Sequence, residues 1–379
     1  ELLDLQGKIG ILEIRTGNVE QGIKDLTQAA AKNPSDLAIT DPLINGLVQR
    51  QRFAEALAVA DRVGKDPAKK TASLIYRGGI LFSQHDNAGA EAAFNNAVAG
   101  DAKSTAALFA RAEMLASMQR QDEALRDFRS VVAIDSKNVP ALLQVAQIAQ
   151  RQGDDRAVRA SLNQAITAQP GNMTPRFALI TYLNTQGKFP EALTSVNEML
   201  RQQPNNTDAL ALQGRIQLAQ KQNKEAVTTY RRLVSLMPTA PGPQVLLGNA
   251  LSISGDRAGA SRALDTAGKL APNSVEIKGA QINFQFNQKN NDAALALARS
   301  YQSANPGSAA DMLLATTLDR VSRPDEAIAV LDKSLSQRPN VGTLMQLSRR
   351  LQLSNPARAE SLLSEWLAKN PADIGVRLD

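Results

Sequence analysis

One repeating pattern runs through all 379 residues of the chain and limits the folds that it can adopt. A small or β-branched residue recurs every 34 residues from Gly22 through Ala294, then after steps of 33 and 32. Its members are Gly22, Ala56, Ala90, Ala124, Val158, Ala192, Ala226, Ala260, Ala294, Ala327 and Ala359. A proline closes most copies in the same register. The chain is therefore an array of similar units that bury their apolar faces on their neighbours.

Each unit contains two helical patterns, as the copy from Thr207 to Ala240 shows most clearly. Leu210 and Gly214 are four residues apart, so they share a helix face. Ala226 and Tyr230 begin a second stripe with the same spacing, and a proline ends it. Two amphipathic helices cannot bury both stripes alone. The pattern predicts an all-α solenoid of stacked helical pairs.

The eighth copy fits a known pattern best, with Leu247-Gly248, Leu251, Gly255, Ala260, Leu264, Ala267 and Pro272. It resembles the tetratricopeptide repeat (TPR) family, and the resemblance covers essentially the whole chain. It implies an all-α, right-handed superhelical solenoid of about eleven helix-turn-helix repeats, as a single domain over residues 1–379. In such arrays the first helix of each repeat, helix A, lines the concave face, and helix B lines the convex face. Because the residues after Pro371 match the start of another helix A, we expect a fragment of a longer array.

Some positions depart from the family pattern. The early tryptophan of the family is replaced by polar residues in seven repeats, which puts the packing of those helix starts in doubt. They are Gln6, Thr40, Arg176, Gln244, Lys278, Asp311 and Thr343. Thr40-Asp41-Pro42 is expected to interrupt a helix A, with Pro42 in its first turn. The missing residues of the last two repeats are expected to come from turns.

The composition argues against catalysis and metal binding. The chain has no cysteine, and its one histidine, His85, lies in a predicted turn. A metal site built of histidine and cysteine is thereby excluded, and most acid–base mechanisms are not expected. Glu123, Glu225 and Glu326 recur at one repeat position, as charges at helix starts do. We therefore predict a protein that is not an enzyme and has no cofactor or metal.

The charge and hydropathy patterns also limit the partners. A net charge of +6 without a basic cluster does not indicate nucleic-acid binding. No apolar run is long enough to span a membrane. Trp366, the only tryptophan, lies at a helix B position that is usually core. It is expected to pack internally, with an interface anchor as the alternative.

The 34-residue register also maps the exposed positions of the A helices, which form the candidate binding surface. The predicted groove residues are Asn45, Gln49, Gln147, Gln150, Arg151, Asn184, Arg215, Asn249, Asn283 and Asn287, accompanied by Phe82, Glu113, Thr181, Ser252, Phe286, Thr316 and Arg320. They are polar, rich in amides and near neutral. They are either ordinary solvated residues or a groove for an extended peptide or a glycan, whose hydrogen-bonding groups suit amides.

Some TPR domains hold a C-terminal carboxylate with a lysine four residues before such an asparagine. That lysine is absent here, because Asp41, Val245 and Gly279 occupy the three positions before Asn45, Asn249 and Asn283. Co-chaperone binding is therefore not expected.

The resemblance implies a non-catalytic scaffold that binds protein or peptide partners, with polysaccharide as a further candidate. The Ala- and Gln-rich helices, the long unbroken register and the opening ELLDLQGKIG resemble bacterial envelope arrays. Among these are the TPR-repeat lipoproteins of PEP-CTERM systems. They imply a periplasmic protein, lipid-anchored at the outer membrane, in exopolysaccharide production or export or in exosortase sorting. The alternatives are the periplasmic TPR region of a polysaccharide secretion porin and the TPR arm of an enzyme such as a glycosyltransferase. A cytoplasmic location also stays open.

Overall fold

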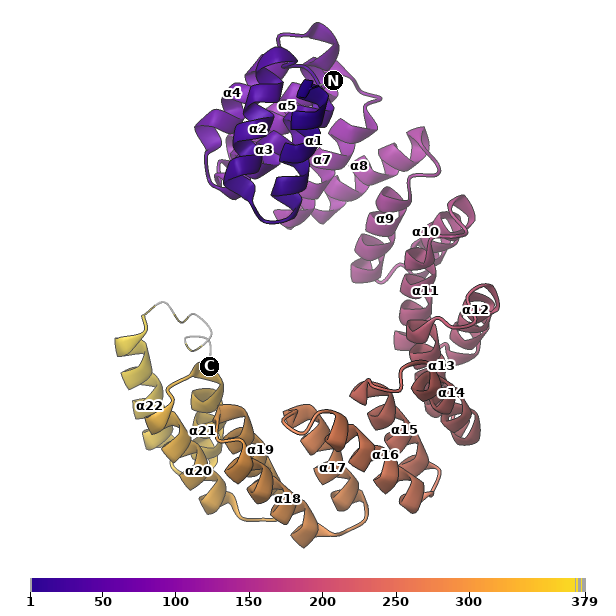
Figure 1. Cartoon of the computed structure of the whole chain (residues 1–379), viewed down its shortest axis with the longest axis vertical. Coiled ribbons are helices and arrows are strands. Elements are labelled where there is room, and N and C mark those ends of the chain that lie inside the picture. The colour runs from indigo at the N-terminus through magenta and orange to yellow at the C-terminus, as the bar shows by residue number, and fades with distance from the viewer. Residues whose placement is uncertain (1, 372, 374–375, 377–379) are drawn as a thin grey trace. The chain divides into compact units, whose positions relative to one another are not determined.

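The computed structural model describes residues 2–371, 373 and 376 of the chain, and these residues form 22 α-helices and one 3-10 turn (Figure 1). The A helices carry odd numbers: α1 (Leu2–Arg15), α3 (Leu37–Gln49), α5 (Lys70–Ser83), α7 (Thr105–Ser117), α9 (Val139–Gln152), α11 (Met173–Thr185), α13 (Thr207–Ala219), α15 (Pro241–Ile253), α17 (Val275–Asn287), α19 (Ser308–Arg320) and α21 (Val341–Ser354). The B helices carry even numbers: α2 (Val19–Lys32), α4 (Phe53–Val63), α6 (Asn87–Gly100), α8 (Gln121–Ile134), α10 (Asp155–Ala168), α12 (Phe189–Gln202), α14 (Asn223–Leu236), α16 (Arg257–Leu270), α18 (Asn291–Ala304), α20 (Pro324–Gln337) and α22 (Pro356–Lys369). The short turn η1 (Pro67–Lys69) precedes α5.

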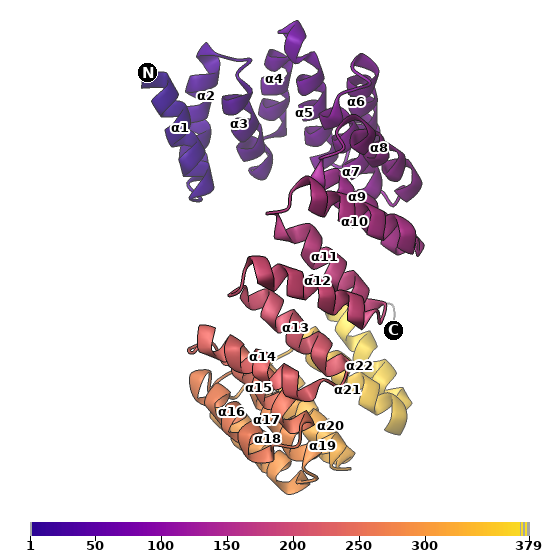
Figure 2. The same ribbon diagram turned by 90° about the vertical axis from the view of Figure 1, so that its right-hand side faces the viewer.

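The chain divides into two compact units, unit 1 (Glu1–Tyr182) and unit 2 (Leu183–Asp379). From α1 to α10 in unit 1 and from α12 to α22 in unit 2, an A helix packs on the B helix that follows it, and that B helix packs on the next A helix. Figure 2 shows this alternation for α1 to α5. Successive A helices also touch, as α5 and α7 do in unit 1 and α15 and α17 in unit 2. The predicted all-α fold of about eleven helical pairs is confirmed.

Small residues stand where the two helices of a pair meet. The recurring B-helix position is buried in every repeat, and Ala124 and Ala226 have no exposed surface. In several repeats the A helix contributes a glycine opposite a bulky residue of the B helix. A Cβ added to Gly78 would lie 2.7 Å from Cε1 of Phe94, and one added to Gly214 would lie 2.5 Å from Cε1 of Tyr230. The register read from the sequence is therefore the register of the helix contacts.

The turn from helix A to helix B needs a left-handed residue. It recurs in the repeat register in ten repeats, with φ between 58° and 91°. Glycine fills it at Gly17, Gly153, Gly187 and Gly255, and other residues fill it at Gln51, His85, Gln119, Lys221, Lys289 and Ser322. A residue with a Cβ is strained in this conformation. His85 is thus a turn residue, as predicted, and one that glycine could replace.

Pro42 is not in the first turn of its helix, so that prediction is wrong. Helix α3 begins at Leu37, and its Pro42 lies in the second turn without interrupting the helix. The helix begins early because the carboxylate of Asp36 accepts a hydrogen bond from the backbone N–H of Ala38, at 3.0 Å. Sequence reasoning placed the start by the proline and overlooked this cap.

Three of the polar residues at the helix starts, Asp311, Thr40 and Thr343, are buried in the helix contacts. Asp311 is only 4% exposed, and its carboxylate accepts hydrogen bonds from Gln302 at 2.8 Å and Arg338 at 2.7 Å. Thr40 is fully buried and donates to the carbonyl of Asp36 at 3.0 Å. Local hydrogen bonds thus satisfy these two groups and keep the helix starts in place. Thr343 differs, because its buried hydroxyl has no partner among the described residues.

The shortened repeats lose residues in their connections, as predicted. The connections before α19 and α21 are residues 305–307 and 338–340, one residue shorter than the connection 237–240 before α15. Asn355 alone joins α21 to α22 and caps α22 through the N–H of Arg358. The predicted further helix A after Pro371 falls mostly on residues outside the described part of the chain.

Candidate functional site

A groove of about 490 Å³ crosses three A helices of unit 1. Helix α3 supplies Asp41, Ile44, Asn45 and Val48, and helix α5 supplies Ile75, Tyr76, Gly79, Ile80, Phe82 and Ser83. Helix α7 supplies Ala110, Glu113, Met114 and Ser117, and Phe94 of α6 reaches the floor from the B layer. Most of these side chains are apolar. The groove can therefore take up apolar groups of a ligand, which would leave water on binding.

Two adjacent glycines of α5, Gly78 and Gly79, lie in different surroundings. Gly78 faces the core, where Phe94 fills the space that a side chain would need. Gly79 lines the groove, and a Cβ added there would meet no atom within 4 Å. Each glycine lowers helix propensity by about 1 kcal/mol relative to alanine. The glycine at 78 allows the helices to approach, whereas the glycine at 79 leaves the groove open.

The groove carries two carboxylates without compensating charge. Asp41 comes from α3 and Glu113 from α7, so they lie on opposite sides of α5. Neither makes a hydrogen bond or an ion pair with any residue that the structure describes, and no lysine, arginine or histidine lines the groove. Both side chains reach solvent, but the apolar surroundings displace part of their water, which raises the pKa of Asp41 and the pKa of Glu113.

Tyr76 adds a third polar group to the groove. Burial raises the pKa of its hydroxyl, and the nearby charge of Asp41 raises it further. The hydroxyls of Ser83 and Ser117 donate to the carbonyls of Gly79 and Met114 in their own helices. Their oxygens can still accept a hydrogen bond from a ligand, and the amide of Asn45 can both donate and accept. The polar groups of the groove are thus acidic or neutral.

The A helices of unit 2 present a different surface. Asn249 of α15 and Asn283 and Asn287 of α17 are exposed. Arg320 of α19 donates to the Oδ1 of Asn283 at 2.5 Å and stacks over the ring of Phe286 at 3.8 Å from its centroid. This contact joins neighbouring A helices. It also means that Asn283, one of the predicted binding residues, already has an intramolecular hydrogen bond.

The predicted groove residues are spread over both units. Asn45 and Gln49 are exposed on α3, Gln147, Gln150 and Arg151 are exposed on α9, Arg215 is exposed on α13, and Asn184 of α11 is half-buried. Of the ten only Asn45 lines the groove of unit 1, together with Phe82 and Glu113 from the wider set. Whether these residues bind a partner stays a prediction.

Sequence reasoning missed Asp41, Tyr76 and Gly79. Asp41 was considered as part of a helix interruption and for the absence of a lysine at its position, and not as a residue of the binding surface. Its place four residues before Asn45 could have identified it, because residues with this spacing share a helix face. Asp41 therefore belongs to the same predicted surface as Asn45.

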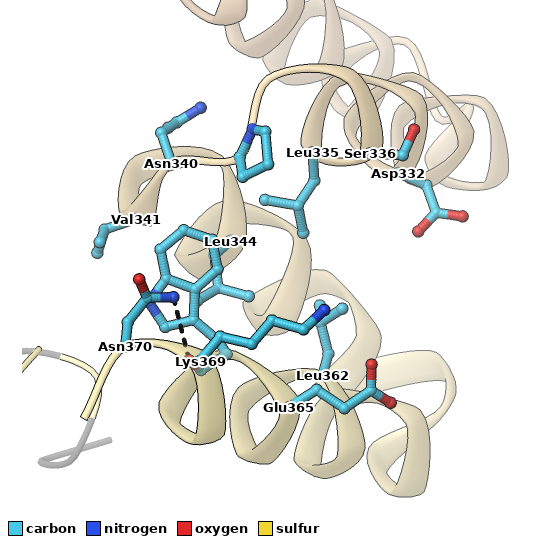
Figure 3. Close-up of a pocket in the computed structure, with 12 residues that line it drawn as sticks. Asp332, Leu335, Ser336, Asn340, Val341, Leu344, Leu362, Glu365, Lys369 and Asn370 are labelled. Carbon is cyan, nitrogen blue, oxygen red and sulfur yellow. Dashed lines mark hydrogen bonds between the residues drawn. The ribbon is translucent and has the colours of Figure 1, made fainter.

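A second hollow, of about 660 Å³, lies between α20, α21 and α22 of unit 2. Figure 3 shows Leu335, Leu344 and Leu362 around it, with the Lys369 side chain reaching towards Leu362. Trp366 also lines this hollow; it is half-buried, and its indole N–H donates to Asp373 at 2.7 Å. The predicted internal packing of Trp366 is therefore incomplete at this end of the described chain. Asp332 pairs with Arg358, and the other charged lining residues are one acid and one base, Glu365 and Lys369, so the charges of this hollow are balanced, unlike those of the groove.

Two of the three recurring glutamates form ion pairs at helix starts, and Glu225 is exposed. Glu123 pairs with Arg120 at 2.6 Å, and Glu326 pairs with Arg299 at 3.0 Å. Among the described residues, no three histidine, cysteine or acidic side chains are grouped as a metal ion would require. No helix in the described part of the chain combines the length and apolarity needed to cross a bilayer.

Comparisons with known proteins give the family of these helical pairs. A family model described as tetratricopeptide repeat matches residues 77–139 and 177–242, together about a third of the chain. No curated protein sequence matches.

Solved structures of low sequence identity are similar to this chain. YrrB, described as a TPR protein with an unusual peptide-binding site, is 18% identical, and the match covers 50% of this chain and 97% of YrrB with a TM-score of 0.40. A tetratricopeptide repeat protein of Parabacteroides merdae is 13% identical over 73% of this chain and 96% of its own, with a TM-score of 0.40. Yeast Tom70 is 12% identical over 96% of this chain and 91% of its own, with a TM-score of 0.47.

The family assignment rests on the two matched segments and on the helix contacts themselves. The matched segments include the Gly214–Tyr230 contact, and the same register of small buried residues continues outside them. Residues 77–139 and 177–242 match the tetratricopeptide repeat family, and the helical pairs outside them are packed in the same way.

Proposed function

We propose that this protein is a non-catalytic scaffold that binds an extended segment of a partner protein on its A helices, with the groove of α3, α5 and α7 as the primary site. One observation carries the proposal: an apolar trough stays open on three neighbouring A helices because Gly79 has no side chain to fill it. Burial of apolar ligand groups there would supply the affinity, and the amide of Asn45 could bond the ligand backbone.

A substitution that fills the groove tests this site. Gly79→Leu should place an apolar side chain in the trough, since no atom lies within 4 Å of the added Cβ. It should also favour the helix, by about 1 kcal/mol. Peptides selected from a display library against the unaltered protein should lose binding to Gly79→Leu. They should keep binding to a protein with Arg231→Ala and Arg232→Ala, two exposed residues of the B helix α14. Selected peptides that bind Gly79→Leu unchanged would place the site elsewhere.

Polysaccharide is the second candidate partner, and the A surface of unit 2 favours it. Asn249, Asn283 and Asn287 are exposed there, and amides suit the hydroxyls of a glycan. Isothermal titration with an acidic and a neutral bacterial exopolysaccharide would detect such binding. A peptide-specific groove in unit 1 and a glycan surface in unit 2 would respond to different substitutions.

The finer part of the proposal gives this scaffold a role in the bacterial envelope, in exopolysaccharide production or export or in exosortase sorting. It is supported by the Ala- and Gln-rich helices, the long unbroken 34-residue register and the opening ELLDLQGKIG, which resemble the PEP-CTERM-system lipoprotein PrsT. The alternatives stay the TPR region of a polysaccharide secretion porin and the TPR arm of an enzyme. Fractionation of the source cells with an antibody against this chain tests the periplasmic location. Signal only in the cytoplasmic fraction would contradict the envelope role.

A further inference from the structure

We propose that the groove of unit 1 selects a cationic partner segment, in which a lysine or arginine is flanked by apolar side chains. The proposal rests on the peptide-binding function proposed above and names the chemistry that this site would recognise. The apolar floor accounts for the flanking residues, and the two unpaired carboxylates account for the positive charge.

The charge pattern of the groove differs from the protein's other surface acids. Most exposed carboxylates in unit 1 accept a hydrogen bond from the chain, either from an arginine, as Asp61 does from Arg77, or from a backbone N–H, as Asp36 does from Ala38. Asp41 and Glu113 have none among the described residues, although the chain carries more basic than acidic residues. Because neither carboxylate forms an ion pair with a described residue, both can pair with a positive charge of a ligand.

The apolar side chains around these carboxylates should strengthen their attraction for a cation. Ile44 and Val48 follow Asp41 along α3, Met114 follows Glu113 on α7, and Phe82 of α5 lines the same groove. Charges interact more strongly beside apolar surface than in open water, because less solvent screens them. The desolvation that raises the pKa of both groups is already present in the free protein, and the attraction of an arriving cation would offset its cost to the charged carboxylates.

An acidic segment would meet the opposite situation. Its carboxylates would approach Asp41 or Glu113 with no lysine or arginine on the groove wall to offset the repulsion. The arginine-bearing surface in unit 2, where Arg320 covers Phe286, offers such a segment a cation instead. The groove of unit 1 therefore discriminates by attraction of one charge and by repulsion of the other.

Three labelled probe peptides of one apolar sequence test the selectivity, with a central lysine, glutamine or glutamate. Binding is measured by fluorescence anisotropy at low and high salt. We expect the lysine probe to bind at least about tenfold more tightly than the glutamate probe at low salt, and the difference to shrink at high salt.

Variants of the full chain separate the contributions. The double variant Asp41→Asn with Glu113→Gln should abolish the preference for lysine and keep the binding of the glutamine probe. Asp61→Asn is the matched control, because it removes an exposed carboxylate of the same unit from the B helix α4. It should leave all affinities unchanged. Thermal melts of each variant check that the repeats stay folded.

The outcomes distinguish this inference from the function on which it rests. If all three probes bind equally well and lose binding to Gly79→Leu, the groove is a peptide site and the cationic selectivity is wrong. If the lysine probe binds Gly79→Leu as tightly as the unaltered protein, both the groove and its selectivity are wrong. Absence of binding by the lysine probe to the unaltered protein would also overturn the selectivity.

Discussion

The A helices of unit 1 and those of unit 2 are built on the same contacts and differ in what they present to solvent. In unit 1, Gly79 leaves an apolar groove open, and Asp41 and Glu113 supply charge without a counter-ion. In unit 2, the amides are exposed, and Arg320 is already engaged with Asn283 and Phe286. The contrast teaches that the repeat fixes the core, while the surface positions of helix A are free to change chemistry from one repeat to the next.

The largest expected effect tests the shared core. Ala124 in unit 1 and Ala226 in unit 2 are both fully buried at the same repeat position. Arginine at either position would overpack the contact and bury a charge, at a cost of about 3 kcal/mol or more. Thermal or urea unfolding of both single variants should show similar losses. A variant that melts like the unaltered protein would contradict the common register.

The second prediction concerns acidic groups that affect stability in opposite directions. Burial by itself would raise the pKa of Asp311, but the hydrogen bonds from Gln302 and Arg338 outweigh it and lower that pKa. Its stabilisation is therefore present above the ordinary aspartate pKa of 3.8 and is lost as pH falls through the lowered value. Asp311→Asn should cost about 2 kcal/mol at neutral pH, the scale of hydrogen bonds to a charged group.

Asp41 is the matched comparison in unit 1. Because its pKa is raised, the folded state disfavours its charged form, and stability should increase as pH falls through the raised value. Asp41→Asn should therefore leave the melting temperature at neutral pH unchanged or higher. Melts of both variants from pH 3 to 8 check the signs. A loss of stability in Asp41→Asn at neutral pH would show that its carboxylate has a structural partner.

The third prediction concerns the amide surface of unit 2. Replacement of Asn249, Asn283 and Asn287 by alanine should change the free energy of unfolding by no more than about 0.5 kcal/mol per site, since all three are exposed. A ligand bound there would lose about 1 kcal/mol per amide. The double variant at Arg231 and Arg232 on α14 is the control in titrations with peptide or exopolysaccharide. Loss of binding in the control alone would move the function to the B helices.

The smallest expected effects lie in the turns, where the two units should behave alike. His85 has φ 65° and Gly153 has φ 74° at the same point of their repeats. His85→Gly should stabilise by at most about 1 kcal/mol, and Gly153→Ala should destabilise by about 1 kcal/mol. Chemical unfolding measures both. Equal and negligible effects would show that the turn tolerates a left-handed residue without strain.

The sequence by itself determined the repeat register, the helical pairs and the exposed A positions. It could do so because a helix contact at Ala226, Gly214 or Gly78 requires a small residue at a fixed spacing, and that spacing is written in the chain. It also placed Asn45, Phe82 and Glu113 on the A-helix surface. It misplaced the start of α3, because the cap at Asp36 acts more strongly than the proline that follows.

Only the tertiary structure decided which exposed positions make a site. The groove needs α3, α5 and α7 beside one another, and it stays open at Gly79, which has no side chain. The adjacent Gly78 is also a glycine, but it faces Phe94 in the core. The pairing of Arg320 with Asn283, 37 residues apart, likewise depends on how one A helix lies against the next. Periodicity assigns residues to a helix face, but hollows and charge balance arise between helices, where side chains from separate repeats meet.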